Sequence, residues 1–437
     1  MRSRIPEFLR WVSTGLVLAC PLAGREAGAQ TATDTLHLRT VITDVVRNND
    51  QAAAMRYMEK AALDRVGPAG AWDDPMLMLG VVNLPTSFDF REDMMTMTMV
   101  GVSHSIPYAG QNGLKADAAR AEAGAATQER QATEIDLVNT AARAYIDAFY
   151  RQESLAILRL QRSLLEQVVA SARGRLTTGA ASQEDVSAAQ AALWRLDAEI
   201  LSAEQELDAA LLSLNALRGR SGDPGAPVLE KPPVDSLSPD PEQWLAAARE
   251  YYPPLRRLDY QAESYSLSAT AARRMRWPML ELNANYGFRR DSEMEQRDDM
   301  VGFGITLSLP VFRGRQEGRM ASSMEAMAIG VESERSQMWR GVEAAIRTLH
   351  RRAVRLNQSL HLYRDRIIPA SEDAFRSALA GYESGRTTFV ALLDYAVAIQ
   401  RDRLTANQLA GDLARTRADA DRFTVDPAQF TASDVKN

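Results

Sequence analysis

The sequence predicts a mainly α-helical protein that also contributes strands to a membrane β-barrel. Three observations support this fold class. Residues 114–218 keep a helical repeat of apolar side chains, other regions alternate apolar and polar residues as strands do, and this order of features occurs twice along the chain. The composition agrees, because the 46% hydrophobic content includes only 7% aromatic residues. Such a composition suits closely packed helices better than one thick core.

The N-terminus has the three parts of a secretory signal, which we assign to residues 1–29. These parts are a basic region, an apolar run and a small-residue cleavage site, found at Arg2, Arg4 and Arg10, at residues 11–23, and at Ala27-Gly28-Ala29. The apolar run is too short to span a membrane. Cleavage after Ala29 takes the formal net charge from −6 to about −8. This negative charge argues against nucleic acid as a partner.

The single cysteine, Cys20, allows a second interpretation of this region. It ends the segment Val17-Leu18-Ala19-Cys20, which resembles a lipoprotein signal, and cleavage there would leave a lipidated N-terminal cysteine. The alternative is a small apolar residue that is discarded with the signal. Pro21 follows directly and a better cleavage site lies downstream, so the sequence favours the discarded residue. On either interpretation the mature chain has no disulfide and no cysteine-metal site.

The first half of the mature chain, residues 30–218, contains helices around a pair of strands. Its central feature is the hairpin 114–218, whose arms meet at a break around Gly179. The first arm, to about residue 176, would be ~95 Å long at the rise of an α-helix, which indicates a protein that spans a distance. In order, we expect a helix at 36–66, extended segments at 72–85 and 95–106 within a strand pair 72–106, and then the hairpin 114–218.

The second half, residues 242–423, follows the same plan. A segment rich in Gly, Pro, Ser and Asp at 219–241 separates the halves as a linker or equatorial segment. The expected elements are a helix at 244–276 interrupted by Pro253-Pro254, extended segments at 277–288 and 300–309 within a strand pair 277–309, a hairpin 316–423 broken around Gly385, and a tail at 424–437. The matching order and spacing predict a tandem repeat. Local residues agree as well, since residues 100–107 align with residues 303–310 when the two halves are compared.

The strands of the second half have one apolar and one small or polar face. Alternate residues from Leu280 to Phe288 and from Val301 to Leu309 are apolar, which is the pattern of a transmembrane barrel. A soluble antiparallel sheet packed on helices has the same alternation. Four strands cannot close a barrel, because about eight is the smallest common number. Strands in a membrane would therefore require oligomerisation, and three copies would supply twelve strands.

No enzymatic constellation is present, and we expect no catalysis and no cofactor. The histidines, which are His37, His104, His350 and His361, lack metal-ligand spacing, and no phosphate loop or nucleophile motif occurs. Methionine is unusually frequent near the first strand pair, at Met76, Met78, Met94, Met95, Met97 and Met99. Thioethers suit Cu(I), but methionine also fills lipid-facing or packed surfaces. The alternation with Thr96 and Thr98 favours the second interpretation.

Two sets of motifs, taken together, resemble the TolC-like outer-membrane efflux channels. The likeness covers nearly the whole mature chain. It rests on the strand-to-helix junctions Ile106-Pro107-Tyr108-Ala109-Gly110 and Leu309-Pro310-Val311-Phe312-Arg313-Gly314 and on the turn segments 175–186 and 381–394. The segments Asp74-Pro75-Met76 and Asn83-Leu84-Pro85 are similar to the heavy-metal exporter branch of that family.

This resemblance implies a homotrimer in which twelve strands form a pore in outer-membrane lipid and helices form a periplasmic tunnel. The tunnel would dock on a periplasmic adaptor protein and an inner-membrane pump of the RND type. The resemblance also implies a gate at the periplasmic tip, with Asp185 and Tyr382 at positions that family members link across the closed tip and Asp394 at an acidic constriction. Ala391 replaces a second acidic residue of that constriction, so a double acidic ring is not expected.

The hairpin tips are also the expected adaptor contacts, because only a tip can meet a coaxial partner end on. The residues concerned are Leu176, Thr178, Gly179, Ser182, Gly385, Arg386 and Thr388. Two other functions fit long helical hairpins, namely a periplasmic adaptor and a soluble coiled-coil scaffold. The duplicated strand pairs favour the channel over both. The sequence does not identify the exported substrate, which could be a drug, a metal ion or a protein.

Overall fold

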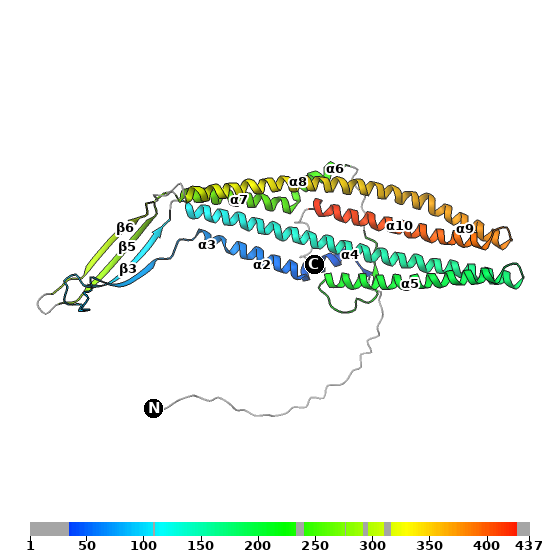
Figure 1. The fold of residues 1–437 in the computed structure, drawn as a ribbon, viewed down its shortest axis with the longest axis horizontal. Coiled ribbons are helices and arrows are strands. Elements are labelled where there is room, and N and C mark those ends of the chain that lie inside the picture. Colours follow the sequence, from blue (N-terminus) through cyan, green and yellow to red (C-terminus); the bar gives the residue numbers. More distant parts are fainter. Residues whose placement is uncertain are drawn as a thin grey trace, which may run out of the picture.

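A computed structural model describes residues 35–107, 110–232, 240–275, 277–291, 296–309 and 316–425. The expected signal peptide with Cys20, both strand-to-helix junctions in part, and the tail beyond residue 425 lie outside this described part. The molecule is elongated, with a sheet at one end and the tips of two helical hairpins at the other (Figure 1). The helices of the described part account for most of its residues, as the predicted fold class requires.

The elements occur in the same order in each half of the chain. The first half contains α1 (Leu38–Asn48), α2 (Asp50–Asp64), α3 (Val66–Gly70), β2 (Met76–Val82), β3 (Met97–Ile106), α4 (Gln111–Thr177) and α5 (Gln183–Leu217). The second contains α6 (Pro241–Tyr251), α7 (Pro253–Arg274), β5 (Leu280–Arg289), β6 (Met300–Leu307), α8 (Glu317–Leu362), α9 (Ile368–Glu383) and α10 (Phe389–Thr424). Short strands β1 (Thr35–Leu36) and β4 (Val228–Leu229) lie outside this pattern.

The single helix expected at 36–66 is wrong, because three helices occupy this region. Asn49 separates the first two, since its backbone is extended and its side-chain oxygen accepts a hydrogen bond from the Gln51 amide. Asparagine favours such a cap because its short side chain satisfies an amide that the helix leaves free. The apolar repeat continued across this cap and concealed the break.

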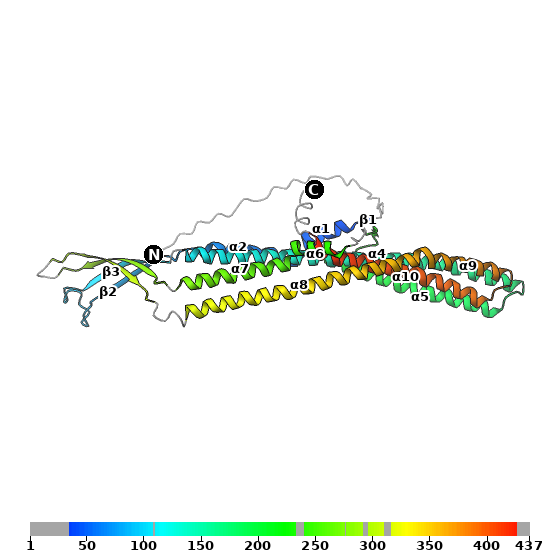
Figure 2. The same ribbon diagram turned by 90° about the horizontal axis from the view of Figure 1, so that it is seen from above.

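The long helix α4 is the axis on which the other helices pack. Its 67 residues extend for about 100 Å. It lies against α2 and α7 in the half near the sheet and against α5 and α10 in the other half (Figures 1 and 2). The apolar repeat predicted for 114–218 forms a buried face on α4, on which Leu164 is only partly buried. Its buried members are Ala141, Tyr145, Ala148, Phe149, Leu155, Leu158, Leu165 and Val168.

The second hairpin contains an irregularity that the sequence analysis missed. Between α8 and α9, residues Tyr363–Ile367 form a turn of π-helix, η1, and Pro369 follows in the first turn of α9. Proline has no amide hydrogen and its ring clashes with the preceding turn. A locally widened helix accommodates these two effects, so the helix passes Pro369 without a chain break.

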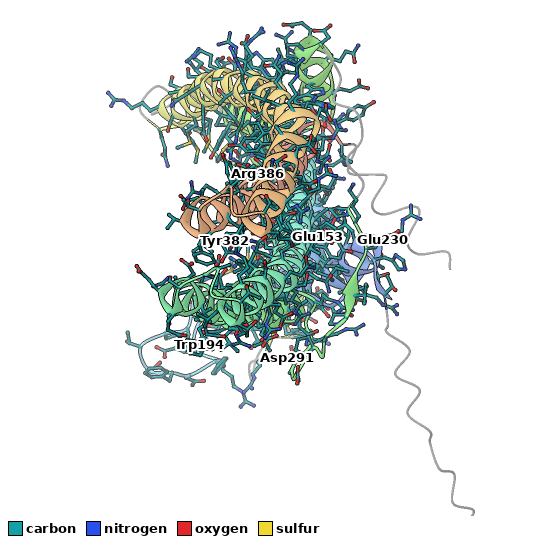
Figure 3. The ribbon with its side chains drawn as sticks, turned by 90° about the vertical axis from the view of Figure 1, so that its right-hand side faces the viewer. Glu153, Trp194, Glu230, Asp291, Tyr382 and Arg386 are labelled. Carbon is teal, nitrogen blue, oxygen red and sulfur yellow. The ribbon has the colours of Figure 1, made fainter. Side chains whose placement is uncertain are left out.

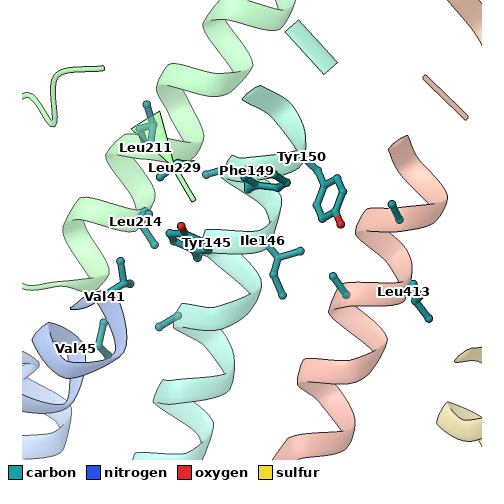
Figure 4. Close-up of a cluster of buried hydrophobic side chains, with 14 of the residues drawn as sticks. Val41, Val45, Tyr145, Ile146, Phe149, Tyr150, Leu211, Leu214, Leu229 and Leu413 are labelled. Carbon is teal, nitrogen blue, oxygen red and sulfur yellow. The ribbon is translucent and has the colours of Figure 1, made fainter. Parts of the chain in front are cut away.

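Tyr145 joins the middle of α4 to segments from both halves. Its hydroxyl lies 2.7 Å from the carbonyl oxygens of Leu36 and Glu230, which share its single hydrogen as acceptors. These carbonyls flank the parallel pairing of β1 with β4. The ring is fully buried beside Val41 and Leu214 (Figure 4). Burial raises the pKa of the Tyr145 hydroxyl to about 12. Part of the expected linker or equatorial segment 219–241, namely β4, is therefore paired and held near the middle of the long helices.

The four long strands form one antiparallel sheet in the order β2-β3-β5-β6. The two hairpins pair through β3 and β5, with Gly101 opposite Asn285. Directly paired residues point to the same side of a sheet, so the register defines two faces. One, which we call the apolar face, carries Leu77, Leu79, Val81, Val100, Val102, Leu280, Leu282, Ala284, Tyr286, Phe288, Val301, Phe303, Ile305 and Leu307. The other, the glycine face, carries Gly80, Gly101, Gly287, Gly302, Gly304, Asn283 and Asn285.

Among the described helices, none combines the length and the apolar character that crossing a membrane requires.

Replacing Tyr145 by phenylalanine tests the equatorial anchor. The Leu36 and Glu230 carbonyls would lose their buried donor, which costs about 1–2 kcal/mol. We expect amide hydrogen exchange at Glu230 to rise about tenfold, because its amide bonds to Leu36 across the pairing. Tyr150→Phe is the matched control, since that hydroxyl donates to no residue of the described part. Equal exchange in both variants would remove Tyr145 as the anchor.

Candidate functional site

The tips of the two hairpins have the same backbone geometry. Gly179 has φ +70° and Gly385 has φ +74°, a conformation that glycine adopts without the penalty of a side chain. In the first tip, Ala180 donates its amide to the Arg175 carbonyl at 2.8 Å, and in the second Arg386 donates to Gly381 at 2.7 Å. These bonds satisfy carbonyls that a helix end leaves free.

A capping residue begins the returning helix in each tip. Ser182 Oγ accepts from the Asp185 amide at 3.1 Å, and the Asp185 carboxylate accepts from the Ser182 amide at 3.2 Å. Thr388 Oγ1 accepts from the Ala391 amide at 3.3 Å. These bonds restrict the entry angle of α5 and α10. Asp185, a predicted gate residue, is therefore also part of the structure that starts α5.

Tyr382 lies where the second tip faces the first (Figure 3). Its side chain is 3% exposed, and its hydroxyl has no hydrogen-bond partner among the described residues. Burial raises the pKa of the Tyr382 hydroxyl, the charge of Asp185 raises it further, and Arg175 partly offsets both effects. The structure thus brings Asp185 and Tyr382 close together without a hydrogen bond between them.

Arg175 connects the two tips, and the sequence analysis did not select it. Its Nη1 donates to the Tyr382 carbonyl at 2.5 Å and to the Glu383 carbonyl at 2.8 Å, while Nη2 donates to Ala180 at 2.9 Å. The guanidinium lies 4.8 Å from the centre of the Tyr382 ring, close enough for a cation–π contact. A cation in the last turn of a helix is a known capping signal, but its partner on another hairpin could not be derived from the sequence.

The two hairpins are also joined deeper along the bundle. Gln161 on α4 is 1% exposed, and its Nε2 donates to the Ala396 carbonyl on α10 at 2.7 Å. Leu155, Leu165 and Ile399 belong to one apolar cluster that all four tip helices share. The tips of one chain therefore form one packed unit.

The remaining predicted site residues are accessible. Asp394 is exposed on α10 and forms no ion pair within the described part. Arg386 is exposed, and its Nε donates to Ser384 Oγ at 3.0 Å. Thr178 is exposed and donates to the Arg175 carbonyl at 3.0 Å, whereas Leu176 is half-buried. The tip thus presents polar and charged groups at its surface.

No group of three or more His, Cys, Asp or Glu side chains is placed to hold a metal ion in the ranges that the structure describes. Two of the histidines pack against aromatic rings instead. His104 is stacked on Trp72 with 5.6 Å between ring centres, and His350 meets Trp244 edge to face at 5.5 Å.

Comparison with known proteins identifies this architecture. Residues 41–220 match the family described as Outer membrane efflux protein. Outer membrane protein TolC of Vibrio cholerae serotype O1 is 20% identical over 389 residues, which cover 82% of this chain and 83% of TolC. The chain is therefore similar to TolC over most of its length.

Solved structures share the TolC-like fold over most of their length. VceC from Vibrio cholerae superposes with a TM-score of 0.73 and 16% identity, covering 89% of this chain and 95% of VceC. The CmeC outer membrane channel of Campylobacter jejuni gives a TM-score of 0.71 and 12% identity, covering 91% of this chain and 89% of CmeC. At sequence identities this low, the comparison shows that the fold is shared.

The role of Arg175 can be measured with Arg175→Met, which keeps an unbranched apolar side chain but removes every donor. Loss of its bonds to two carbonyls of the second tip should cost about 1–2 kcal/mol locally. We expect amide exchange across residues 381–387 to rise about tenfold. Arg173→Met is the control, because within the described part the side chain of Arg173 bonds to Gln190 of its own hairpin, at 2.7 Å, and not to the second tip. Unchanged exchange in Arg175→Met would show that apolar packing alone joins the tips.

Proposed function

We propose that three copies of this TolC-like chain form an outer-membrane channel that carries exported small molecules or metal ions out of the cell. The observation that carries this proposal is the four-stranded sheet. Its outer strands, β2 and β6, each pair on one side only. In a membrane, an unpaired strand edge costs several kcal/mol for each unsatisfied backbone group. Three copies would supply twelve strands and leave no edge, which is enough for a barrel.

The apolar face of the sheet fits contact with lipid. Phe303 is 84% exposed, Ile305 72% and Leu79 72%, and a soluble monomer rarely presents so continuous an apolar surface. Trp72 and Trp277 precede the two strand pairs and are 60% and 58% exposed. Tryptophan favours the boundary between lipid and water, so these residues support a membrane border at the helical end of the sheet. A soluble scaffold or adaptor would leave this surface unexplained.

The helices supply the proposed periplasmic tunnel, and the tips supply its docking end. Each tip is farthest from the sheet (Figure 1) and presents polar groups, including Arg386 and Thr178, to a coaxial partner. We assign that partner as a periplasmic adaptor, which would couple the channel to an inner-membrane pump of the RND type. Substrate selection would belong to the pump, because a wide water-filled duct selects little. We also propose that the two halves, 30–218 and 242–423, arose by duplication.

The proposed assembly can be tested with the purified full-length protein in detergent and in planar bilayers. We expect a protein mass of three protomers and discrete single-channel conductance. Deleting β2 and β3 (76–106) together removes one complete hairpin and should abolish both, because the remaining strands cannot close. A monomer that forms no pores would refute the shared barrel.

We propose that Asp185 and Tyr382 belong to the periplasmic gate and that Asp394 lines a constriction. Three Asp394 carboxylates around a pore axis would favour cations. The Tyr382 hydroxyl is buried and has no hydrogen-bond partner among the described residues, so closure of the tip would have to move the ring to give it a donor or acceptor from a neighbouring copy. Leaving such a group unpaired is costly, so closure of the tip would stabilise it.

If Asp185 and Tyr382 hold the gate closed, the double variant Asp185→Asn, Tyr382→Phe should conduct more than the wild type. Asparagine can still accept the Ser182 amide and keep the helix cap, so the change removes charge and the hydroxyl rather than the fold. We expect the resting single-channel conductance to rise severalfold. Glu184→Gln is the matched control, since Glu184 is exposed in the same helical turn. Unchanged conductance in the double variant would exclude these two residues from the gate.

A further inference from the structure

The register of the sheet places the strand methionines on the glycine face. Met78 is opposite Gly101, which is opposite Asn285, and that row ends at Gly302. Two residues farther along each strand, the residues paired across the sheet are Gly80, Met99, Gly287 and Met300. By the alternation of strands, Met76 and Met97 share this side. The strand methionines therefore lie on the side opposite the apolar face, so of the two surfaces considered for them, lipid-facing or packed, the proposed assembly leaves the packed one.

Three methionines surround Gly287. Met99 and Met300 are its direct partners on the two neighbouring strands. The Met97 sulfur lies over Gly287, only 2.5 Å from the place where a Cβ of residue 287 would stand. Any larger residue would displace this thioether. Neighbouring strands lie about 4.8 Å apart, so the unbranched side chains of Met99 and Met300 can meet above the glycine.

The surroundings leave this position accessible to an ion. Met97 and Met99 are half-buried, and Met300 is 42% exposed. Among the described residues, Arg289 is a cation on the same face and is opposite Met97. Its Nε donates to the Asp298 carbonyl at 2.6 Å, so the guanidinium is held toward the loop that follows β5. The groups next to Gly287 on this face are thus neutral thioethers.

The chemistry of three thioethers selects one class of ion. Thioether sulfur is soft and uncharged, and it binds Cu(I) and its analogue Ag(I), whereas Mg²⁺, Ca²⁺ and Mn²⁺ prefer oxygen. Zn²⁺ sites use thiolate, imidazole or carboxylate ligands. A monovalent soft ion needs none of these ligands, and the glycine at the centre lets the Met97 sulfur lie close to the backbone between Met99 and Met300.

We propose that Met97, Met99 and Met300 form a binding site for a soft monovalent cation, Cu(I) or Ag(I). Met78 lies over Gly101 in a similar way, with its methyl carbon 3.4 Å from the Cβ position there, and extends the row of sulfur along the same face. In the proposed trimer this face lines the pore, and the ion is then cargo. That last step rests on the proposed channel function, whereas the binding site does not.

Silver ion provides the test, because it is stable in air and binds thioethers as Cu(I) does. Full-length protein in chloride-free detergent buffer would be titrated with Ag⁺ by calorimetry, with Met methyl NMR signals as a second readout. We expect the wild type to bind an Ag⁺ per protomer that Zn²⁺ does not displace. The variant Met97→Leu, Met99→Leu, Met300→Leu should lose this ion, while the strand pairs keep their apolar volume.

Two further variants separate coordination from packing. Met320→Leu with Met327→Leu changes exposed methionines on α8 and should keep the site. Gly287→Ala retains every sulfur but displaces that of Met97, so we expect at least tenfold weaker Ag⁺ binding. Wild-type binding in the triple variant, or equal binding of Zn²⁺ at the site, would overturn the proposal. A protein that binds Ag⁺ but forms no trimeric pores would instead refute only the channel.

Discussion

Backbone hydrogen bonding at the two edges of the sheet is the constraint on which the proposed assembly depends. Inside one chain, β3 and β5 are paired on both sides, whereas β2 and β6 each present a free row of amides and carbonyls. Water can satisfy such a row, but lipid cannot. Because β6 and β2 run in opposite directions, the edge of one copy can continue the antiparallel pattern of the next. The apolar face would then lie outside and the glycine face inside.

This arrangement also explains why the helices are so long and so firmly connected at the equator. A sheet that joins a barrel with its neighbours determines where the helices of each copy begin. The α4 helix transmits that position from the sheet to the tip over about 100 Å, and it has no chain break through which the position could be lost. Tyr145 fixes α4 to β1 and β4 near its middle. β1 and β4 therefore support α4 near its middle, where its packing changes from α2 and α7 to α5 and α10.

The sequence predicted the parts of the structure that depend on periodicity. The apolar repeat of 114–218 gave the α4–α5 hairpin, and Gly179 and Gly385 marked its turn and that of α9–α10, because few other residues adopt positive φ. Alternation identified the strands. The break at Asn49 and the π-helical turn before Pro369 escaped prediction, because a local cap and a backbone adjustment hardly alter the apolar pattern. Arg175 escaped as well, since its acceptors on Tyr382 and Glu383 are more than 200 residues away. Strand register determines which residues share a face with the methionines, and alternation within a single strand could not show this.

The contacts at the tip indicate where a trimer of this chain could open. Arg175 binds the backbone of the other hairpin, and Gln161 repeats the connection farther up through Ala396. With the shared apolar cluster, these bonds make the two hairpins of one copy a single body. Separating them would expose buried carbonyls and apolar side chains together. Asp394 and Arg386 are already exposed, so moving these side chains has no such cost. Opening of the proposed gate is therefore expected between copies, where exposed groups such as Asp394 and Arg386 are available, and not inside the packed unit in which Tyr382 is buried.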